Sequence, residues 1–135
     1  MKPKKTRNNK RWTEARWRGF VVSALRAASR RWPPKSDVLK SAKVGLVKSK
    51  HFKDRMVNAY RCAMCLNAFT HVNIRVDHKR PVVDPTKGWQ GFDKFIERLF
   101  CEAEGLQAVC KACHKTKTDD ERKQRNEQRR SAKEK

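Results

Sequence analysis

The sequence contains few acidic residues: 14 Asp and Glu stand against 35 Lys and Arg, and the formal net charge is +21. Such a surface attracts polyanions, because each contact with a phosphate releases counterions. An anionic membrane surface is the competing partner. The basic residues, however, are spread along the whole chain and are not gathered beside Trp and Leu on one helix. The charge balance therefore favours a nucleic acid, bound mainly through its backbone phosphates, and no membrane.

Long hydrophobic runs are absent as well. No apolar stretch approaches the roughly 18 residues that a membrane helix requires. The basic N-terminus that starts at Met1 is not followed by the hydrophobic segment of a secretory signal. We therefore expect a cytoplasmic protein. In a reducing compartment, spaced cysteine pairs bind metal more often than they form disulfides.

The length of 135 residues allows one domain with tails. We expect a basic flexible arm over residues 1–11 and an N-terminal helical, DNA-binding extension over 12–58. A core over 59–122 should follow. The charged tail over 123–135 should fray over its last ten or so residues.

Helical patterns mark the N-terminal extension. Thr13 is predicted as the N-cap of a helix over 14–31, in which apolar residues recur at helical spacing. The pair Pro33-Pro34 should end that helix. Ser36 should then cap a second, short helix over Asp37–Val44, before the Lys-rich stretch 48–55 leads to the first cysteine pair.

The second half of the sequence mixes both periods. Alternating polar and apolar residues over 72–77 predict a half-buried strand. An amphipathic helix is expected around Phe92–Phe100, and the apolar stretch Leu106–Val109 predicts another strand. After Cys113 a polar helix should run toward the end of the chain. The expected fold class is α+β, mainly helical.

Four of the five cysteines form two C-x-x-C pairs, Cys62 with Cys65 and Cys110 with Cys113. Two such turns complete a closed shell of four thiolates, which is typical of structural zinc. A zinc ion there would tie the start of the core to its end, as a small core requires.

Other interpretations of these residues remain. Cys110-Lys-Ala-Cys113-His114 also has the form of a c-type haem attachment motif. Haem attachment would leave the first cysteine pair unexplained and would require export. His51 or His71 could replace one cysteine as a zinc ligand. Cys101 is predicted to be a small buried hydrophobe.

Asp77, His78 and His114 remain outside this zinc site. A neutral imidazole can take a proton from water, and a divalent cation with few protein ligands can bind phosphate oxygens. Asp77 and His114 together could hold such a cation, which leaves His78 as the free base. Neighbours on a regular strand point to opposite faces, so both reach one site only if the strand ends or distorts there. The plainer interpretation is a surface turn at Asp77 and His78, with His114 beside the zinc.

Two segments resemble a known family. They are Asp77-His78-x-x-Pro81 and Leu106-Gln-x-x-Cys110-x-x-Cys113-His114-x-x-Lys117-Thr118. Together they look like an HNH endonuclease of the His-Me finger, or ββα-metal, superfamily, in its zinc-stabilised branch. Trp-Thr-Glu-Ala-Arg at 12–16 and Arg-Trp-Pro-Pro at 31–34 extend the similarity to small HNH nucleases of tailed phages. The motif proper covers residues 62–118.

The resemblance implies an antiparallel hairpin and a helix folded round one divalent ion, as the zinc-braced nuclease core over 59–122. His78 would be the general base, and Asp77 and His114 the ligands of Mg²⁺ or Mn²⁺, beside a structural Zn²⁺. The implied function is DNA cleavage or nicking in phage packaging, homing or DNA processing, in the host cytoplasm, with terminase or portal components as further partners. The residues expected to contact DNA phosphates are Lys117, Lys79, Arg80, Arg16, Arg18, Lys10 and Arg11.

One position departs from the family pattern. Gly105 stands where the family has an Asn that braces the loop between the two strands. Three explanations compete: a naturally weakened enzyme, a different bracing residue and an engineered change. The alternative to a nuclease is a non-catalytic zinc-ribbon protein that binds nucleic acid, or an accessory factor of a phage terminase.

Overall fold

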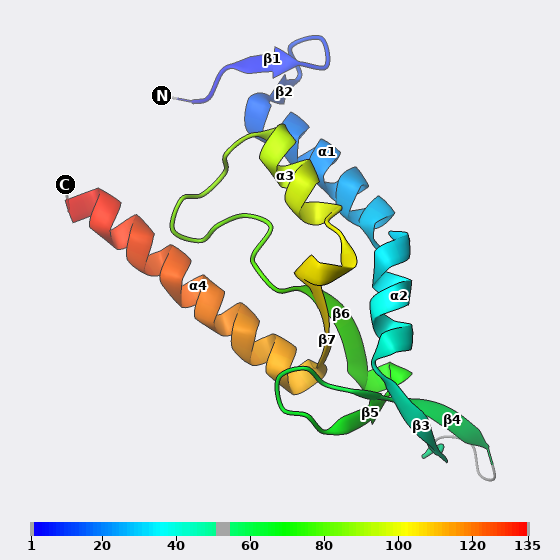
Figure 1. Cartoon of the computed structure of the whole chain (residues 1–135). Coiled ribbons are helices and arrows are strands. Elements are labelled where there is room, and N and C mark those ends of the chain that lie inside the picture. The colour runs from blue at the N-terminus through cyan, green and yellow to red at the C-terminus, as the bar shows by residue number, and fades with distance from the viewer. Residues whose placement is uncertain (1, 51–54, 135) are drawn as a thin grey trace. The chain divides into compact units, whose positions relative to one another are not determined.

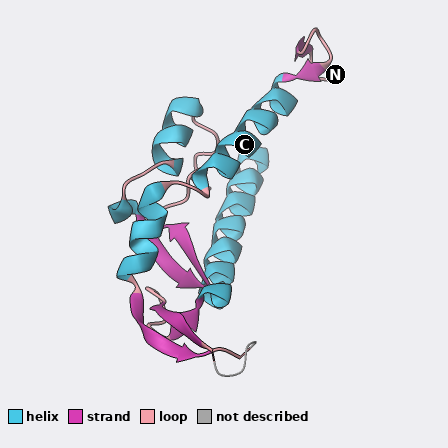
Figure 2. Cartoon of the chain, turned by 90° about the vertical axis from the view of Figure 1, so that its right-hand side faces the viewer, coloured by secondary structure: helices cyan, strands magenta, loops and turns pink. Residues whose placement is uncertain are grey.

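The computed structural model of the chain describes residues 2–50 and 55–134, so His51 lies outside the described residues. The fold is a mixed α+β arrangement in which helices account for more residues than strands (Figures 1 and 2). The chain divides into two compact units, residues 1–32 and residues 33–135. This division falls between the first two helices, so the second helix belongs with the cysteine-containing part of the chain.

The first unit contains a small hairpin and one long helix. Strand β1 (Lys5–Arg7) pairs antiparallel with β2 (Trp12–Thr13), and α1 (Glu14–Ser29) follows directly. The Thr13 side chain accepts a hydrogen bond of 3.1 Å from the Arg16 backbone N–H, which confirms it as the N-cap. The helix ends two residues before the predicted residue 31.

The basic arm takes part in this hairpin, whereas the sequence predicted a flexible segment. Thr6 Oγ1 and Arg7 Nε donate hydrogen bonds of 2.6 and 2.9 Å to the Glu14 carboxylate. The Arg7 guanidinium also lies over the Trp17 ring, 3.8 Å from its centroid. These contacts hold the basic arm against the start of the helix. The composition of residues 1–11 alone gave no sign of them.

The second unit begins with α2 (Pro33–Ser41), so the predicted helix over Asp37–Val44 starts and ends too late. Proline is favoured in the first turn of a helix, because its missing N–H has no helical partner there. The prolines that were expected to separate two helices therefore open the second one.

A three-stranded antiparallel sheet follows, where the sequence predicted only a Lys-rich connection. It consists of β3 (Lys43–Lys48), β4 (Met56–Arg61) and β5 (Ala68–Thr70), with β4 in the middle. Most β3 side chains are exposed, and the exposed Val44, Leu46 and Val47 lack the alternation with buried positions that predicts a strand.

A second, two-stranded ribbon carries the predicted site residues. After a short 3-10 turn, η1 (His71–Asn73), strand β6 (Ile74–His78) pairs antiparallel with β7 (Leu106–Cys110). Both strands are confirmed, although β6 begins two residues later than predicted. The long helix α4 (Lys111–Glu134) follows β7 without a loop. Two antiparallel strands and a helix therefore lie next to one another.

The core of the second unit lies around this ribbon. Helices α2 and α4 lie on opposite sides of β6 and β7 (Figures 1 and 2). One buried cluster packs against Leu39 of α2 and against Ala42, the residue that follows this helix; it consists of Cys62, Ile74, Ala108, Val109 and Cys110. The predicted amphipathic helix is α3 (Phe92–Leu99), which buries Phe95 and Leu99.

The C-terminal part of α4 is exposed. The sequence predicted a polar helix after Cys113 that runs toward the end of the chain, and α4 continues to Glu134. The fraying of the charged tail over 123–135 stays a prediction. The α4 side chains from Arg122 to Lys133 are all exposed, so no packing against the rest of the unit holds this part of the helix. Within residues 2–50 and 55–134, no helix combines the length and the apolar character needed to cross a bilayer.

Candidate functional site

The four cysteines of the two C-x-x-C pairs come together. Their Sγ atoms all lie within 4.8 Å of one another, and those of Cys65 and Cys110 are 3.9 Å apart. A tetrahedral zinc ion with Zn–S bonds of about 2.3 Å spaces its sulfur ligands by roughly 3.8 Å. The four thiolates therefore fit a structural metal such as zinc with little movement. Among the described residues, neither His71 nor any other His, Asp or Glu belongs to this cluster.

Backbone amides converge on the cysteine sulfurs. Cys65 N and Cys110 N donate to Cys62 Sγ over 3.5 and 3.3 Å, and Cys113 N donates to Cys110 Sγ over 3.4 Å. The N–H of Ala63 donates to Ala108 O at 2.8 Å and ties the first cysteine turn to β7. N–H donors stabilise the thiolate relative to the thiol, and the thiolate is the form that binds metal.

The ionisation of the thiols differs within the cluster. Burial acts to raise the pKa of Cys62, but the amides of Cys65, Cys110 and Met64 outweigh it and bring this pKa to about 6. The pKa of Cys113 rises to about 12, mainly because its thiol is hydrogen-bonded to Cys110 and then because it is buried. Four crowded sulfurs cannot all ionise without a cation between them, which is the chemistry that a bound zinc ion would supply.

Asp77 and His114 also come together, from β6 and from the first turn of α4. The distance from His114 Nε2 to Asp77 Oδ1 is 4.0 Å. Two ligands that each lie about 2.0–2.2 Å from one ion can be at most about 4.4 Å apart. This pair can therefore share a divalent ion with little rearrangement.

Lys117 lies inside this same site, where the sequence had predicted a contact with DNA phosphate. Its Nζ donates to Asp77 Oδ2 at 2.9 Å and to the backbone carbonyl of His78 at 2.7 Å. It also forms an ion pair of 3.0 Å with Glu121. Burial acts to lower the pKa of Lys117, but Asp77 and Glu121 raise it above its ordinary value, so the ammonium is charged at neutral pH.

Glu121 was missed by the sequence analysis. Its spacing of four residues from Lys117 on a helix was a usable signal, because such residues are neighbours on one face.

The ring of His78 has a hydrogen-bond partner of its own, outside the Asp77–His114 pair. β6 is paired with β7 up to His78 and ends at that residue, as a site shared by Asp77 and His78 requires. His78 Nε2 lies 2.8 Å from the carbonyl oxygen of Leu99, at the end of α3. A carbonyl can only accept, so Nε2 carries the proton and Nδ1 keeps its lone pair.

The environment of His78 favours the neutral ring. Burial lowers the pKa of His78 below its ordinary value of 6.5 and outweighs the bond to Leu99, which acts in the other direction. The positive charges of Lys35 and Lys117 lower the pKa further. The structure thus provides a buried imidazole with a fixed tautomer and a lone pair on Nδ1. The carbonyl of Leu99 has no signature in the sequence.

Space, rather than backbone angle, restricts the residue at Gly105. Its φ is not among the positive values of the chain. A Cβ at this position would lie 2.9 Å from Cys101 Sγ, closer than real Cβ contacts. Two other contacts hold the end of β6, because Lys79 N donates to Gly105 O at 2.8 Å and Lys117 binds the His78 carbonyl. Of the three explanations for this glycine, a different bracing residue therefore has contacts to support it.

Burial raises the pKa of the partly buried Cys101 thiol, which keeps it protonated.

The other predicted phosphate contacts fall into two groups. Lys79 and Arg80 are exposed and follow His78 at the end of β6. The other four, Arg16, Arg18, Lys10 and Arg11, lie in the first unit and are exposed there. Arg16 lies over the Trp12 ring at 4.7 Å, and Lys10 has a positive φ in the turn between β1 and β2.

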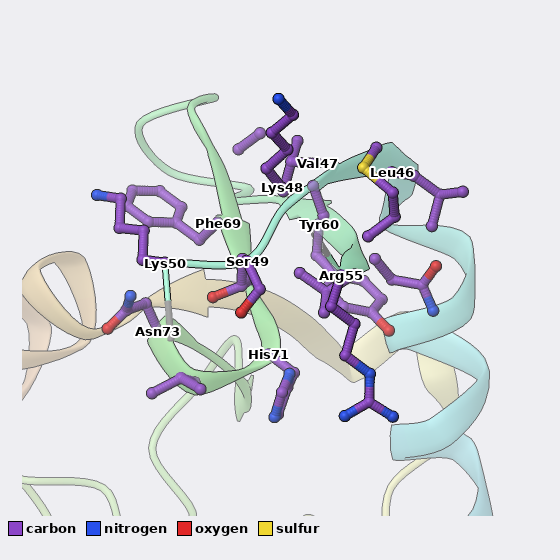
Figure 3. Close-up of a pocket in the computed structure, with 17 residues that line it drawn as sticks. Leu46, Val47, Lys48, Ser49, Lys50, Arg55, Tyr60, Phe69, His71 and Asn73 are labelled. Carbon is purple, nitrogen blue, oxygen red and sulfur yellow. The ribbon is translucent and has the colours of Figure 1, made fainter. Parts of the chain in front are cut away.

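A separate groove of about 910 Å³ runs along β3, β4, β5 and η1 (Figure 3). Apolar and aromatic side chains such as Leu46, Val47 and Phe69 line it, together with the basic Lys48 and Lys50. It contains none of the predicted site residues, so the candidate reaction site is not this concavity.

Comparisons with known proteins return nothing: no family model, curated protein or solved structure matches the chain.

Proposed function

We propose that the protein is a metal-dependent DNA endonuclease or nickase, in which β6, β7 and α4 form a ββα-metal unit of the HNH type. The observation that carries this proposal is the pairing of Asp77 Oδ1 with His114 Nε2 at 4.0 Å, at the junction of the strand pair and the helix. A carboxylate and an imidazole at this separation are a minimal ligand set for a divalent ion with open positions.

Asp77 and His114 would hold Mg²⁺ or Mn²⁺. When bound, such an ion supplies positive charge to the scissile phosphate and to the leaving oxygen. The four cysteines would hold Zn²⁺ in a closed shell without an open position, so their role is to fix the ribbon and the start of α4.

His78 would act as the general base. Its Nε2–H is engaged by Leu99 O, so the ring is oriented and Nδ1 is free to accept a proton from water. Its lowered pKa keeps the imidazole neutral at physiological pH, which a base requires. Polarisation by the Leu99 carbonyl increases the basicity of the other ring nitrogen.

DNA fits the charge of the chain. The net charge of +21 favours a polyanion, and Lys79 and Arg80 carry exposed positive charge directly after the proposed base. In the phage setting that the resemblance implies, the protein would act in the host cytoplasm with terminase or portal components.

The experiment that tests the proposal is plasmid cleavage with Mg²⁺ or Mn²⁺, using zinc-loaded native protein, His78→Ala and His71→Ala. His71 is an exposed histidine of η1 and serves as the matched control. Native protein and His71→Ala should nick or cut the plasmid, whereas His78→Ala should be inactive. Equal activity of all three proteins, or no activity of any of them with any divalent ion, would reject the proposal.

A second candidate is a zinc protein that binds nucleic acid without cutting it. The ammonium of Lys117 on Asp77 favours this candidate, because an ion pair already satisfies part of that carboxylate. Calorimetry separates the two functions: a weak Mn²⁺ site that Asp77→Ala abolishes supports the enzyme. A third candidate is a terminase accessory factor that is active only in its complex. Full activity of the isolated chain would rule it out.

A further inference from the structure

The ammonium group of Lys117 already lies at the candidate ion site beside Asp77. The side chain of Lys117 is only 17% exposed, and its ammonium contacts the Asp77 carboxylate, the His78 carbonyl and the Glu121 carboxylate. Three oxygen atoms around one positive charge are an arrangement that a small metal ion also accepts.

We propose that Lys117 is a positioning residue that serves as the internal counter-ion of Asp77, holding the end of β6 in place and keeping divalent-ion binding weak. This inference rests on the proposed function, since it concerns the same Asp77–His114 site. It assigns to Lys117 a role inside the protein in place of the DNA contact that its position suggested.

The geometry separates two roles for the Asp77 carboxylate. Oδ2 accepts from Lys117 at 2.9 Å, while Oδ1 is the oxygen that lies 4.0 Å from His114. An ion between Asp77 and His114 would therefore share the carboxylate with the ammonium. The two cations would be near neighbours in a partly buried setting, where solvent screens their repulsion only in part.

Loss of the ammonium has two opposite effects on ion binding. It removes the repulsion and leaves two carboxylates, Asp77 and Glu121, without their common cation. It also removes one constraint on the Asp77 side chain. The strand stays fixed up to Asp77, because Val76 and Asp77 remain paired with Ala108 and Gln107. Only its end at His78 loses a contact. We therefore expect the electrostatic effect to dominate and the ion to bind more tightly.

The rate of DNA cleavage should fall when the Lys117 ammonium is lost, although ion binding becomes tighter. The 2.7 Å bond from Lys117 to the His78 carbonyl holds the backbone of the proposed base to α4. Without this bond, the orientation of His78 relative to Asp77 and His114 becomes less defined. Small errors in the position of a base are costly for rate. A variant without the ammonium should thus combine tighter ion binding with slower cleavage, which a purely structural role for Lys117 would not produce.

The test is calorimetric titration of zinc-loaded protein with Mn²⁺ at low ionic strength. Lys117→Met is compared with Lys115→Met, which removes the same charge from the exposed side of the same helix turn. We expect Lys117→Met to bind Mn²⁺ roughly tenfold more tightly than native protein, and Lys115→Met to change affinity by less than about twofold. Equal or weaker binding by Lys117→Met relative to Lys115→Met overturns the inference.

A second variant guards against misfolding and separates the two effects. Lys117→Gln removes the charge but keeps an N–H donor for the His78 carbonyl. It should bind Mn²⁺ as tightly as Lys117→Met and retain more plasmid cleavage at saturating Mn²⁺. Should neither variant gain affinity while both retain zinc, the inference is wrong. If native protein cuts no DNA, the proposed function fails, and the titrations still decide the role of Lys117.

Discussion

The two ends of the β6–β7 ribbon have different chemistry. At the Ile74–Cys110 end, four soft sulfur atoms converge, and two of the cysteines, Cys62 and Cys110, are buried. At the His78–Leu106 end, oxygen atoms of Asp77 and His78 surround the Lys117 ammonium, and the His114 imidazole lies 4.0 Å from Asp77. Soft thiolates select zinc, whereas carboxylate and imidazole suit Mg²⁺ and Mn²⁺. Under the proposed function, one short ribbon would present two metal sites, and neither would compete for the other's ion.

The difference also concerns what each end requires from the rest of the fold. The sulfur end is complete once two turns meet, and its amide donors come from the same turns. The other end draws on β6, the end of α3 and two turns of α4. We infer that the first end carries stability and that the second carries reactivity.

Removal of zinc should have the largest effect, because unfolding of the second unit would disrupt the groups at both ends of the β6–β7 ribbon. Structural zinc contributes on the order of 10 kcal/mol to the folding of small domains. Chelation, or Cys110→Ser, should therefore unfold the second unit and abolish Mn²⁺ binding, as measured by circular dichroism and calorimetry. Cys101→Ala is the control, since Cys101 lies outside the cluster. A chelated protein that melts like the native one would contradict a structural role for the metal.

Substitution of His114 should separate the two ends. His114 follows the zinc ligand Cys113 but pairs with Asp77. We expect His114→Ala to keep its zinc, to lose Mn²⁺ binding and to cleave plasmid at least about 100-fold more slowly. Metal content by mass spectrometry and cleavage rates measure the two effects. Loss of zinc in this variant would instead assign His114 to the sulfur end.

Gly105→Asn should introduce steric strain at the His78–Leu106 end of the ribbon and leave the four-cysteine cluster unaffected. Because a Cβ there meets Cys101 Sγ at 2.9 Å, we expect Gly105→Asn to destabilise the second unit by about 1–3 kcal/mol in urea unfolding. Cys101→Ala should recover part of this loss in the double variant. Only the double variant gives a fair test of whether Asn raises the cleavage rate. A single variant as stable as the native protein would show that the site relaxes freely.

The smallest effect on the ribbon should come from the first unit. Thr13→Ala removes the N-cap of α1 and should cost that helix about 1 kcal/mol, while Thr13→Ser should retain the cap. Neither variant should alter zinc content or Mn²⁺ affinity. A change in either metal site would reveal a coupling between the two units.

The sequence predicted the sulfur end well, because the spacing of Cys62, Cys65, Cys110 and Cys113 carries its geometry. It also predicted β7, α3 and the start of α1, whose patterns are local. It missed β3, whose exposed apolar residues show no alternation with buried positions, and it missed β4, which pairs with β3. It could not show that the Leu99 carbonyl holds His78 or that Lys117 turns inward, since backbone acceptors and side-chain directions depend on tertiary structure.

The length and continuity of α4 determine where insertions and deletions can be tolerated during evolution. Cys113, His114, Lys117 and Glu121 all lie in its first three turns, and each position is locked to the others by a rotation of about 100° per residue. One inserted residue before Glu121 would turn these groups away from one another. The exposed turns beyond Arg122 can gain or lose residues freely, so extensions and fusions are tolerated there.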